Sequence, residues 1–395
     1  MTRLDPDRWR RRQGMARLLD ALGAGEGLTR YVGGAIRDDL LGIAVNDVDL
    51  ATRIEPEDVM ARLKRARIKA VPTGIDHGTI TAVSDGHPYE ITTLRRDVTT
   101  DGRRATVAFT DDWQEDAARR DFTINALLAD PLTGELFDYF GGLDDIAGRR
   151  VRFIGEPLQR IAEDHLRILR FFRFHARFGA GEPDPAGVAA CAARANDLMA
   201  LSRERIADEL TKLLGLPDPV ATVRIMLDRG ILAPVLPEIE PEAAARLAAL
   251  IAAERSAGIE PEAVRRLAAL LPADPIVAAD VAARLRLSNK AKSRLVSAAE
   301  PDGGVNPRTL AYQLGGAGAV DRLLLAGKPD EARGIADWTA PRLPLGGGDL
   351  IARGLAKGPA VARTLRRIEQ RWVDQGFPSG AALEAIIAEE VSRAE

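Results

Sequence analysis

The stretch YVGGAIRDDLLGIAVNDVDLAT, residues 31–52, decides how the rest of the chain is interpreted. Gly33 and Gly34 allow close backbone approach and unusual φ angles, which suit a phosphate-binding turn. Arg37 follows where the N-terminus of a helix would add its own positive end. The end of the stretch predicts a strand, in which two-residue alternation places the carboxylates of Asp47 and Asp49 on one face.

Two carboxylates on one strand face repel each other and lose solvation. Hard divalent cations need such pairs and would remove the repulsion, so Asp47 and Asp49 are candidate metal ligands and catalytic residues. A third carboxylate on a neighbouring strand usually completes a two-metal site, and Glu90 in YEITTL is the candidate. Surface carboxylates on exposed strands are the alternative. The glycine spacing fits neither a Rossmann fingerprint nor a Walker A loop.

The segment DDWQEDAARRDFTINALL, residues 111–128, carries a second group of candidates. If it is helical, Asp121 and Asn125 share one face. Arg120 beside them could clamp a triphosphate through two hydrogen bonds. The alternative is a helix N-terminus with ordinary surface pairs, which the segment taken alone favours.

The segment RIAEDHLRILRFFRFHARFG, residues 160–179, predicts one amphipathic helix whose phenylalanines form a core-facing stripe. Asp164 precedes Arg167 by three residues and shares its face, while Glu163 is placed to form an ion pair with Arg167. An adjacent aspartate and arginine offer an acceptor and donors to a nucleobase edge. A solvated arginine face is the alternative. The arginine stripe consists of Arg167, Arg170, Arg173 and Arg177.

A basic cluster lies much later, in RLRLSNKAKSRL, residues 284–295, where Ser288 is a plausible N-cap. A contact with an RNA backbone and a solvated helix face are equally compatible with this cluster. Its members, weak candidates for RNA binding, are Arg284, Arg286, Lys290, Lys292 and Arg294.

Composition limits the remaining classes. A chain of 395 residues is too long to fold around one hydrophobic core, so we expect two to four subdomains. The net charge of -3 means that any RNA site is a local patch. The single cysteine fits a reducing cytoplasm, and neither a signal peptide nor an apolar run of membrane-spanning length is found. No histidine follows His175, which excludes a histidine-based site in the second half.

The order of patterns predicts a mixed α/β part up to about residue 140 and helices after about residue 150, with a boundary near GGAG, residues 315–318. The expected elements of the first part are a helix over 8–22, a strand and turn entering a helix over 30–42, a helix over 55–66, a hairpin over 78–94 and a hairpin-like unit over 127–142.

Together these motifs resemble the bacterial class II tRNA nucleotidyltransferase and poly(A) polymerase family, within the polymerase-β-like nucleotidyltransferase superfamily. The resemblance covers most of the chain and is specific over roughly the first 215 residues. It rests on the opening stretch and on RRDFTINAL, DYFGGLDDI, EDHLRILRFFRF and SRERIADELTKLL, and more loosely on a tail segment over 344–372. His165 stands where many members carry proline.

The resemblance implies an α+β fold, a small mixed-sheet nucleotidyltransferase head followed by an elongated all-α neck, body and tail. The expected divisions are a head with an N-terminal helix over 1–140, a neck with the base-recognition helix over 141–215, a body over 216–315 and an RNA-binding tail over 316–395.

The implied activity is template-independent addition of CCA to the 3′ end of tRNA from CTP and ATP, with Mg²⁺ in a two-metal site. Asp164 and Arg167 would read the base edge of C or A and reject G and U. With the residue patterns above, the candidate nucleotide-binding residues are Gly33, Gly34, Arg37, Arg120, Asp121, Asn125, Asp164, Arg167, Arg170 and Arg173.

Three alternatives stay open. Poly(A) polymerases share every head motif, and the family also admits enzymes that add only CC or only A. We see no long basic extension suited to general RNA, which favours a tRNA substrate. A non-catalytic RNA-binding protein on the same scaffold is the third alternative, and the retained motif residues argue against it. No membrane association is expected, and the oligomeric state stays open.

Overall fold

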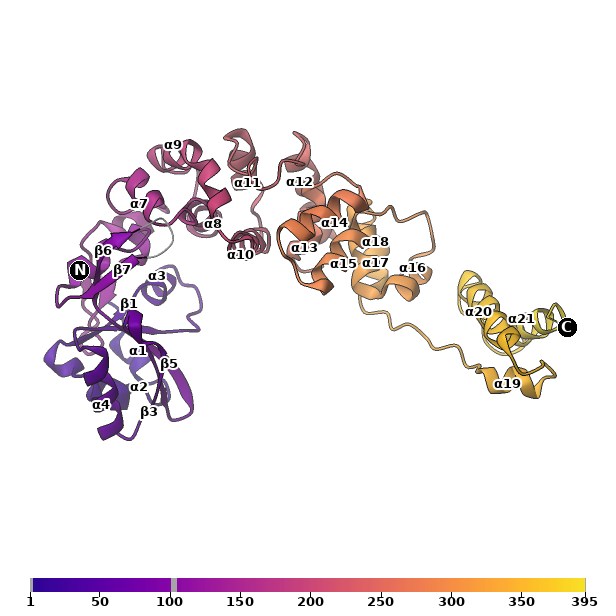
Figure 1. Ribbon diagram of the computed structural model, residues 1–395, viewed down its shortest axis with the longest axis horizontal. Helices are drawn as coiled ribbons and strands as arrows, with labels where there is room; N and C mark the ends of the chain where they lie inside the picture. Colours follow the sequence, from indigo (N-terminus) through magenta and orange to yellow (C-terminus); the bar gives the residue numbers. More distant parts are fainter. Residues whose placement is uncertain (1–2, 101–104, 395) are drawn as a thin grey trace. The chain divides into compact units, whose positions relative to one another are not determined.

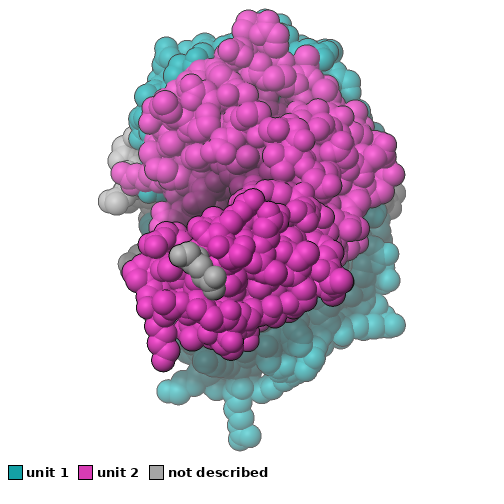
Figure 2. All heavy atoms as spheres, turned by 90° about the vertical axis from the view of Figure 1, so that its right-hand side faces the viewer, with its two compact units in different colours: residues 1–237 teal, residues 238–395 magenta. Residues whose placement is uncertain are grey.

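The computed structural model describes residues 3–100 and 105–394. The chain forms two compact units, unit 1 (Met1–Pro237) and unit 2 (Glu238–Glu395). Figure 1 traces their elements, and Figure 2 shows their surfaces in teal and magenta. The predicted fold class, a mixed-sheet part followed by helices, is confirmed, whereas the four-part division of the chain stays a prediction. Among the described residues, no helix has the length and hydrophobicity that a membrane span requires.

The main sheet of unit 1 has seven strands in the order β3-β4-β5-β2-β1-β8-β9. β2 and β5 are parallel, and the other neighbouring pairs are antiparallel, so the sheet is mixed. Both predicted hairpins, β4–β5 and β8–β9, are confirmed. The strands are β1 (Thr29–Val32), β2 (Asp49–Thr52), β3 (Lys69–Gly74), β4 (Thr79–Ser84), β5 (His87–Thr93), β8 (Leu128–Ala129) and β9 (Leu136–Phe137), with a separate pair, β6 (Arg95–Thr100) and β7 (Ala105–Phe109).

The α-helices of unit 1 follow the predicted order, and α3 and α4 lie where they were expected. These helices are α1 (Pro6–Arg10), α2 (Met15–Ala21), α3 (Gly34–Leu40), α4 (Pro56–Arg65), α5 (Trp113–Ala118), α6 (Gly142–Ala147), α7 (Pro157–Glu163), α8 (Arg167–Phe178), α9 (Pro185–Ala193), α10 (Arg203–Leu214) and α11 (Val220–Asp228). Short 3₁₀ helices are η1 (Ala24–Glu26), η2 (Ile75–His77), η3 (Thr123–Asn125) and η4 (Ala195–Ala200).

The single helix expected over residues 8–22 is wrong, because α1 and α2 are separated by a turn at residues 11–14. Gly14 has a φ of 77°, and a Cβ at this position would lie 2.6 Å from the carbonyl oxygen of Ser84. The chain therefore needs glycine here to approach the β4–β5 hairpin closely.

The helix predicted over residues 160–179 is also interrupted, and so is the helix considered over residues 111–128. Between α7 and α8, Asp164 is extended, and its carboxylate accepts the N–H of Leu166 at 3.1 Å, a local bond that competes with helix. After α5 the chain turns at Asp121, whose carboxylate accepts the N–H of Phe122 at 2.8 Å. Asp121 and Asn125 thus lie on a loop and a 3₁₀ turn instead of an α-helical face.

The aromatic side of α8 is buried, as its periodicity predicted. Phe171, Phe174 and Phe178 are each less than 7% exposed. Phe122 packs against Phe174 with ring centroids 5.1 Å apart, and Phe153 stacks on Phe171 at 5.3 Å. This packing stabilises the position of α8 against the loop that carries Asp121.

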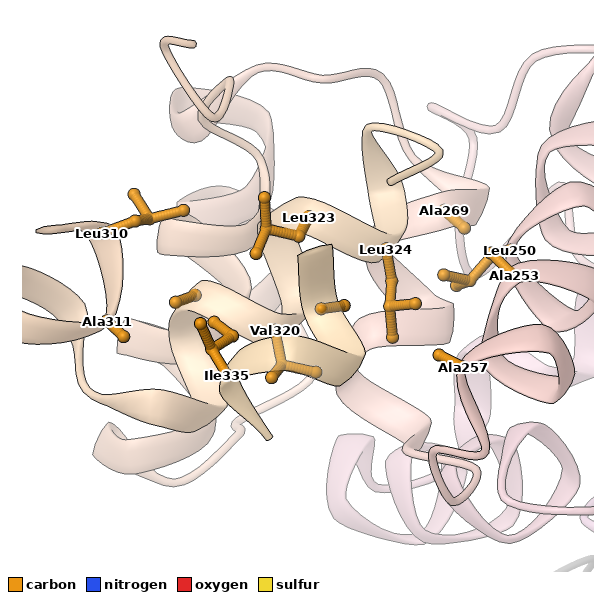
Figure 3. Packing of buried hydrophobic residues seen from close by; sticks show 12 residues of the cluster. Leu250, Ala253, Ala257, Ala269, Leu310, Ala311, Val320, Leu323, Leu324 and Ile335 are labelled. Carbon is orange, nitrogen blue, oxygen red and sulfur yellow. The ribbon is translucent and has the colours of Figure 1, made fainter. Parts of the chain in front are cut away.

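Unit 2 is helical throughout its described residues. Leu250, Val320, Leu323 and Leu324 belong to one of its cores (Figure 3), and Trp372 belongs to a second core formed mainly by the last three helices. The helices are α12 (Ala243–Ala257), α13 (Ala263–Leu270), α14 (Pro275–Arg284), α15 (Asn289–Ala298), α16 (Pro307–Leu314), α17 (Gly316–Leu325), α18 (Pro329–Ile335), α19 (Gly347–Ala352), α20 (Pro359–Asp374) and α21 (Ala381–Ser392).

Candidate active site

The three candidate carboxylates line one recess of about 640 Å³ on the main sheet. Asp47 and Asp49 are exposed while Val48 and Leu50 are buried, so the predicted alternation is confirmed although β2 begins only at Asp49. The parallel register pairs Leu50 with Ile91, and the preceding residues Asp49 and Glu90 therefore lie side by side on the same face.

Electrostatics in this recess favour a bound cation. Loss of hydration raises the pKa of Asp49 to about 6, and the charges of Glu90 and Asp47 act in the same direction, while Arg120 opposes them. Asp49 is exposed as a residue, yet the protein around its carboxylate displaces enough water to disfavour the ionised form. Arg120 therefore offsets these effects only in part, and a bound cation would stabilise the ionised form of Asp49.

Among the described residues, no three acidic, histidine or cysteine side chains are arranged to hold a metal ion by themselves. This arrangement still fits Mg²⁺, because that ion keeps several waters and is usually bound by one or two carboxylates together with substrate phosphates. Asp47 and Asp49 supply hard oxygen donors of this kind, and Glu90 lies beside Asp49.

A second cavity, of about 430 Å³, brings together all but one of the candidate nucleotide-binding residues. Arg120 connects the two cavities, because it lines this one and its charge acts on Asp49 of the other. We call this cavity the nucleotide pocket. Its lining residues are Gly33, Gly34, Arg37, Arg119, Arg120, Asp121, Asn125, Asp164, Arg167, Arg170 and Phe174.

The floor of the nucleotide pocket is the turn from β1 into α3. Gly33 has φ 74° and ψ −128°, which only glycine adopts readily, and a Cβ there would lie 3.2 Å from the guanidinium of Arg120. Arg37 is buried, donates to Asp38 at 2.8 Å and to the side-chain oxygen of Asn125, and lies 4.0 Å from the ring centroid of Phe178. The protein therefore fixes this guanidinium before any ligand arrives.

Asp121 organises the wall of the pocket. Burial alone would raise the pKa of Asp121, but the Arg170 guanidinium and hydrogen bonds from Asn125 and Phe122 outweigh it and hold the pKa below its usual range. Arg170 donates to one carboxylate oxygen from two nitrogens, at 2.8 and 2.5 Å, and Asn125 donates to the other oxygen at 2.9 Å. Asp121 thereby fixes the orientation of both neighbours.

Asp164 and Arg167 lie at the break between α7 and α8. Arg205 on α10 donates to Asp164 at 2.7 Å. Arg167 donates to Glu163 at 2.5 Å, the predicted ion pair, and to the backbone oxygens of Arg160 and Arg119 at 2.9 and 3.1 Å. Both side chains are held by the protein within the pocket lining, which is the arrangement that a base-reading pair needs.

Arg173 is the candidate that the structure places outside the pocket lining. Its guanidinium donates to the buried carboxylate of Glu209 on α10 at 2.6 Å. It therefore joins α8 to α10. Sequence reasoning missed Arg119, Arg205 and also Arg12, which lines the carboxylate recess. Arg12 lies in a segment distant in sequence from the motifs, and Arg205 lies in the motif SRERIADELTKLL but reaches Asp164 across 41 residues, so no local spacing indicates either contact.

Two members of the basic cluster of unit 2 form ion pairs with carboxylates of the same unit. Arg284 pairs with Glu238 at 2.6 Å, and Arg294 pairs with the buried Asp321 at 2.5 Å. Arg286, Lys290 and Lys292 are exposed. Ser288 caps α15 as predicted, accepting the N–H of Ala291 at 3.3 Å. Two of the five weak RNA-binding candidates thus support the fold of unit 2 itself.

Known proteins share this architecture. Residues 29–152 match the model of the poly(A) polymerase head domain, and residues 182–242 match that of a probable RNA- and SrmB-binding site of polymerase A. The structure of the Bacillus stearothermophilus CCA-adding enzyme in complex with CTP is 25% identical with a TM-score of 0.68, and the match covers 99% of each chain. A Thermotoga maritima CCA-adding enzyme complexed with tRNA shares the fold, with a TM-score of 0.71 at 20% identity over 100% of this chain and 97% of that one.

Two relatives match over most of their length. The mitochondrial CCA tRNA nucleotidyltransferase 1 of Mus musculus is 33% identical over 370 residues, which is 88% of this chain and 83% of the relative. The CCA-adding enzyme of Lacticaseibacillus paracasei is 33% identical over 378 residues, or 92% of each chain. With the recess and pocket described above, these matches show that the chain is a nucleotidyltransferase and belongs to the family of CCA-adding tRNA nucleotidyltransferases and poly(A) polymerases.

Proposed function

We propose that this enzyme adds the 3′-terminal CCA sequence to tRNA from CTP and ATP without a nucleic-acid template. The observation that carries the proposal is the junction of the two cavities. A pocket walled by fixed arginines and by Asp164 adjoins a recess of three carboxylates, with Arg120 between them. Two relatives that match over most of their length, from a mammal and a bacterium, are CCA-adding enzymes, and this supports the choice of substrate.

The reaction joins the 3′ hydroxyl of the RNA to the α-phosphorus of the nucleotide and releases pyrophosphate. Two Mg²⁺ ions, with Asp47 and Asp49 as their protein ligands, would supply Lewis acidity and lower the pKa of the attacking hydroxyl. The N–H groups at the start of α3 would face the phosphates, and Arg37 and Arg120, which line the same pocket, would neutralise part of their charge. Glu90 adds a third carboxylate oxygen donor beside Asp49. The enzyme itself forms no covalent intermediate.

Base selection follows from the chemistry of Asp164 and Arg167. The Watson–Crick edges of cytosine and adenine both offer an amino donor beside a ring-nitrogen acceptor. A carboxylate accepts from the amino group, and a guanidinium donates to the ring nitrogen. Guanine and uracil present a carbonyl oxygen and a ring N–H at these positions, so the same pair would leave polar groups unmatched. Arg205 and Glu163 would keep the two side chains in place.

The experiment that tests the proposal uses tRNAs ending without A, without CA and without CCA. Each is incubated with CTP, with ATP and with both, and the 3′ ends are sequenced. We expect CC from CTP alone on the shortest tRNA, CCA from both nucleotides, and a stop after the terminal A. A long A tract would identify a poly(A) polymerase, and a stop after CC or addition of A alone would identify a partial enzyme. We expect the activity in the cytoplasm, where the reduced Cys191 would persist.

A further inference from the structure

The turn between α1 and α2, residues 11–14, lies outside the part of the chain that matches the head-domain model, which begins at residue 29. It nevertheless borders the carboxylate recess, because Arg12 and Gln13 are among the residues that line it. Nothing in the motifs of the head assigns this turn a role. Its contacts indicate one.

The turn is fixed to the hairpin that carries Glu90. The hydroxyl of Tyr89, the residue beside Glu90, donates to the carbonyl of Gln13 at 2.7 Å. The hydroxyl of Ser84 donates to the carbonyl of Gly14 at 2.9 Å. Gln13 in turn donates to the carbonyl of Asp85 at 2.9 Å. Two hydrogen bonds donated by the hairpin and one accepted by it therefore determine where the turn lies.

From this fixed base, Arg12 reaches the loop that carries Asp47. Its guanidinium donates to the carbonyl of Asn46 at 2.6 Å and also to the carbonyl of Val45. These are the two residues directly before Asp47. Among the described residues, these two carbonyls accept hydrogen bonds from Arg12 alone. A guanidinium suits this task, because its planar fork holds two acceptors in a fixed relation.

The loop needs such support. Residues 43–48 have no regular secondary structure, and Asn46 and Asp47 are exposed. Gly42 and Ile43 are still held by backbone bonds to α3, at 3.0 and 2.8 Å. Val48 is buried again, where the chain enters β2. Between these anchors, the bonds from Arg12 fix the backbone that presents Asp47.

We propose that Arg12 is a positioning residue of the active site, which fixes the loop before Asp47 in register with the hairpin that carries Glu90. This inference rests on the proposed nucleotidyl transfer, in which Asp47 is a metal ligand. Arg12 would act through the backbone of Val45 and Asn46, without contacting the nucleotide. Losing its bonds would let Asp47 drift from Asp49 and Glu90, and displacement by about 1 Å can cost about a hundredfold in rate.

The test compares Arg12→Ala with Arg11→Ala, a matched control. Arg11 is the adjacent arginine, is exposed, and pairs with Asp7 of the preceding helix α1 at 2.6 Å. Hydrogen exchange of residues 43–49, measured without metal, nucleotide or RNA, should be faster in Arg12→Ala than in wild type or Arg11→Ala. In steady-state transfer, kcat should fall by about ten- to a hundredfold, while the KM for CTP and for tRNA changes by less than about threefold.

A third variant, Arg12→Lys, distinguishes the planar shape of the guanidinium from its positive charge. It also replaces Arg12→Ala as the test if Arg12→Ala does not fold. Lysine keeps the charge but is a point donor without a planar fork, so we expect only partial recovery of both kcat and exchange protection. Full recovery by lysine would overturn the proposal, as would unchanged exchange and kcat in Arg12→Ala. A rise in the KM for tRNA with unchanged exchange would instead identify a direct RNA contact. The exchange measurement uses no substrate, so its result stands even if wild-type enzyme adds other nucleotides.

Discussion

The nucleotide pocket and the carboxylate recess adjoin each other in unit 1, yet they differ in whether their carboxylates are paired with cationic side chains. In the pocket, carboxylates are already paired, since Asp121 accepts hydrogen bonds from Arg170 and Asp164 accepts one from Arg205. In the recess, carboxylates face each other, and loss of hydration together with the neighbouring Glu90 raises the pKa of Asp49 to about 6.

This difference separates groups that are organised before binding from groups that need a ligand to be stable. A paired and hydrogen-bonded charge keeps its geometry in the empty protein. A cluster of like charges gains most from an external cation, because that cation removes both repulsion and the cost of lost hydration. The pocket is therefore suited to reading a base edge, and the recess to holding metal.

The largest effect is expected from removing a charge in the recess. Asp49→Asn keeps the shape of the side chain but removes a proposed metal ligand, so transfer of CMP to tRNA should fall by at least about a thousandfold. Asp47→Ala should act similarly. Binding of tRNA, measured by filter retention, should stay within about twofold of wild type, because the substitution leaves the rest of the protein intact.

Thermal unfolding would show whether each of these variants is folded. If a folded Asp49→Asn lost tRNA binding as severely as it lost transfer, the recess would be part of the RNA-binding surface, and the assignment of these carboxylates to metal would fail.

A smaller effect is expected in the pocket, on selectivity more than on rate. Arg167→Ala removes donors that the pocket holds through Glu163 and two backbone oxygens. Its discrimination of CTP and ATP against GTP and UTP should fall by about ten- to a hundredfold, the worth of one good base-edge contact. Competition of nucleotide pairs on one tRNA measures this ratio. Unchanged selectivity, with tRNA affinity reduced, would place Arg167 against the RNA instead.

The sequence predicted part of the difference between the nucleotide pocket and the carboxylate recess. The alternation at 47–50 and the glycine turn are local patterns, and local patterns place strands, turns and ion pairs such as Glu163–Arg167 well. The prediction of a continuous helix over 160–179 was wrong because the carboxylate of Asp164 accepts hydrogen bonds from the backbone N–H of Leu166 and from Arg205. Arg12 and Arg205 reach the site from distant segments, and the packing that brings them there leaves no periodic signal.

The raised pKa of Asp49 predicts how metal binding depends on pH. A metal ligand must be ionised, and Asp49 takes up a proton as the pH falls through about 6, so affinity should fall there, by up to tenfold for each pH unit below. Mn²⁺ binding followed by electron paramagnetic resonance, at about pH 7, 6 and 5, measures this. If the Mn²⁺ affinity instead fell with a midpoint near pH 4, Asp49 would have an ordinary aspartate pKa, and the proposed effect of lost hydration and neighbouring charge would be wrong.

The same shift has a consequence for stability without metal. The pKa of Asp49 is higher in the folded than in the unfolded chain, so its protonated form favours folding. That contribution is complete below the usual aspartate range and is lost as the pH rises through about 6. Asp49→Asn should therefore unfold at a slightly higher temperature than wild type at neutral pH, and the difference should vanish in acid.

The smallest effect on transfer is expected in unit 2, where the same contrast divides the basic cluster. Arg294 is paired with Asp321, which is fully buried and also accepts a hydrogen bond from Arg265 at 3.2 Å. Arg294→Ala should lower the free energy of unfolding by about 2 kcal/mol, because a buried carboxylate loses a charged partner. Lys292→Ala, at an exposed position on the same helix, should leave stability unchanged.

For tRNA binding we expect the opposite order of effects, with Lys292→Ala impaired and Arg294→Ala unchanged. A lysine that meets an RNA phosphate releases a counterion, so Lys292→Ala should weaken binding by a few-fold and reduce its salt dependence by about one ion. Folded Arg294→Ala should bind tRNA as wild type does, because its guanidinium is already engaged by Asp321. If Arg294→Ala lost affinity at unchanged stability, pairing inside the protein would no longer distinguish structural arginines from those that meet the substrate, and the contrast drawn in unit 1 would not extend to unit 2.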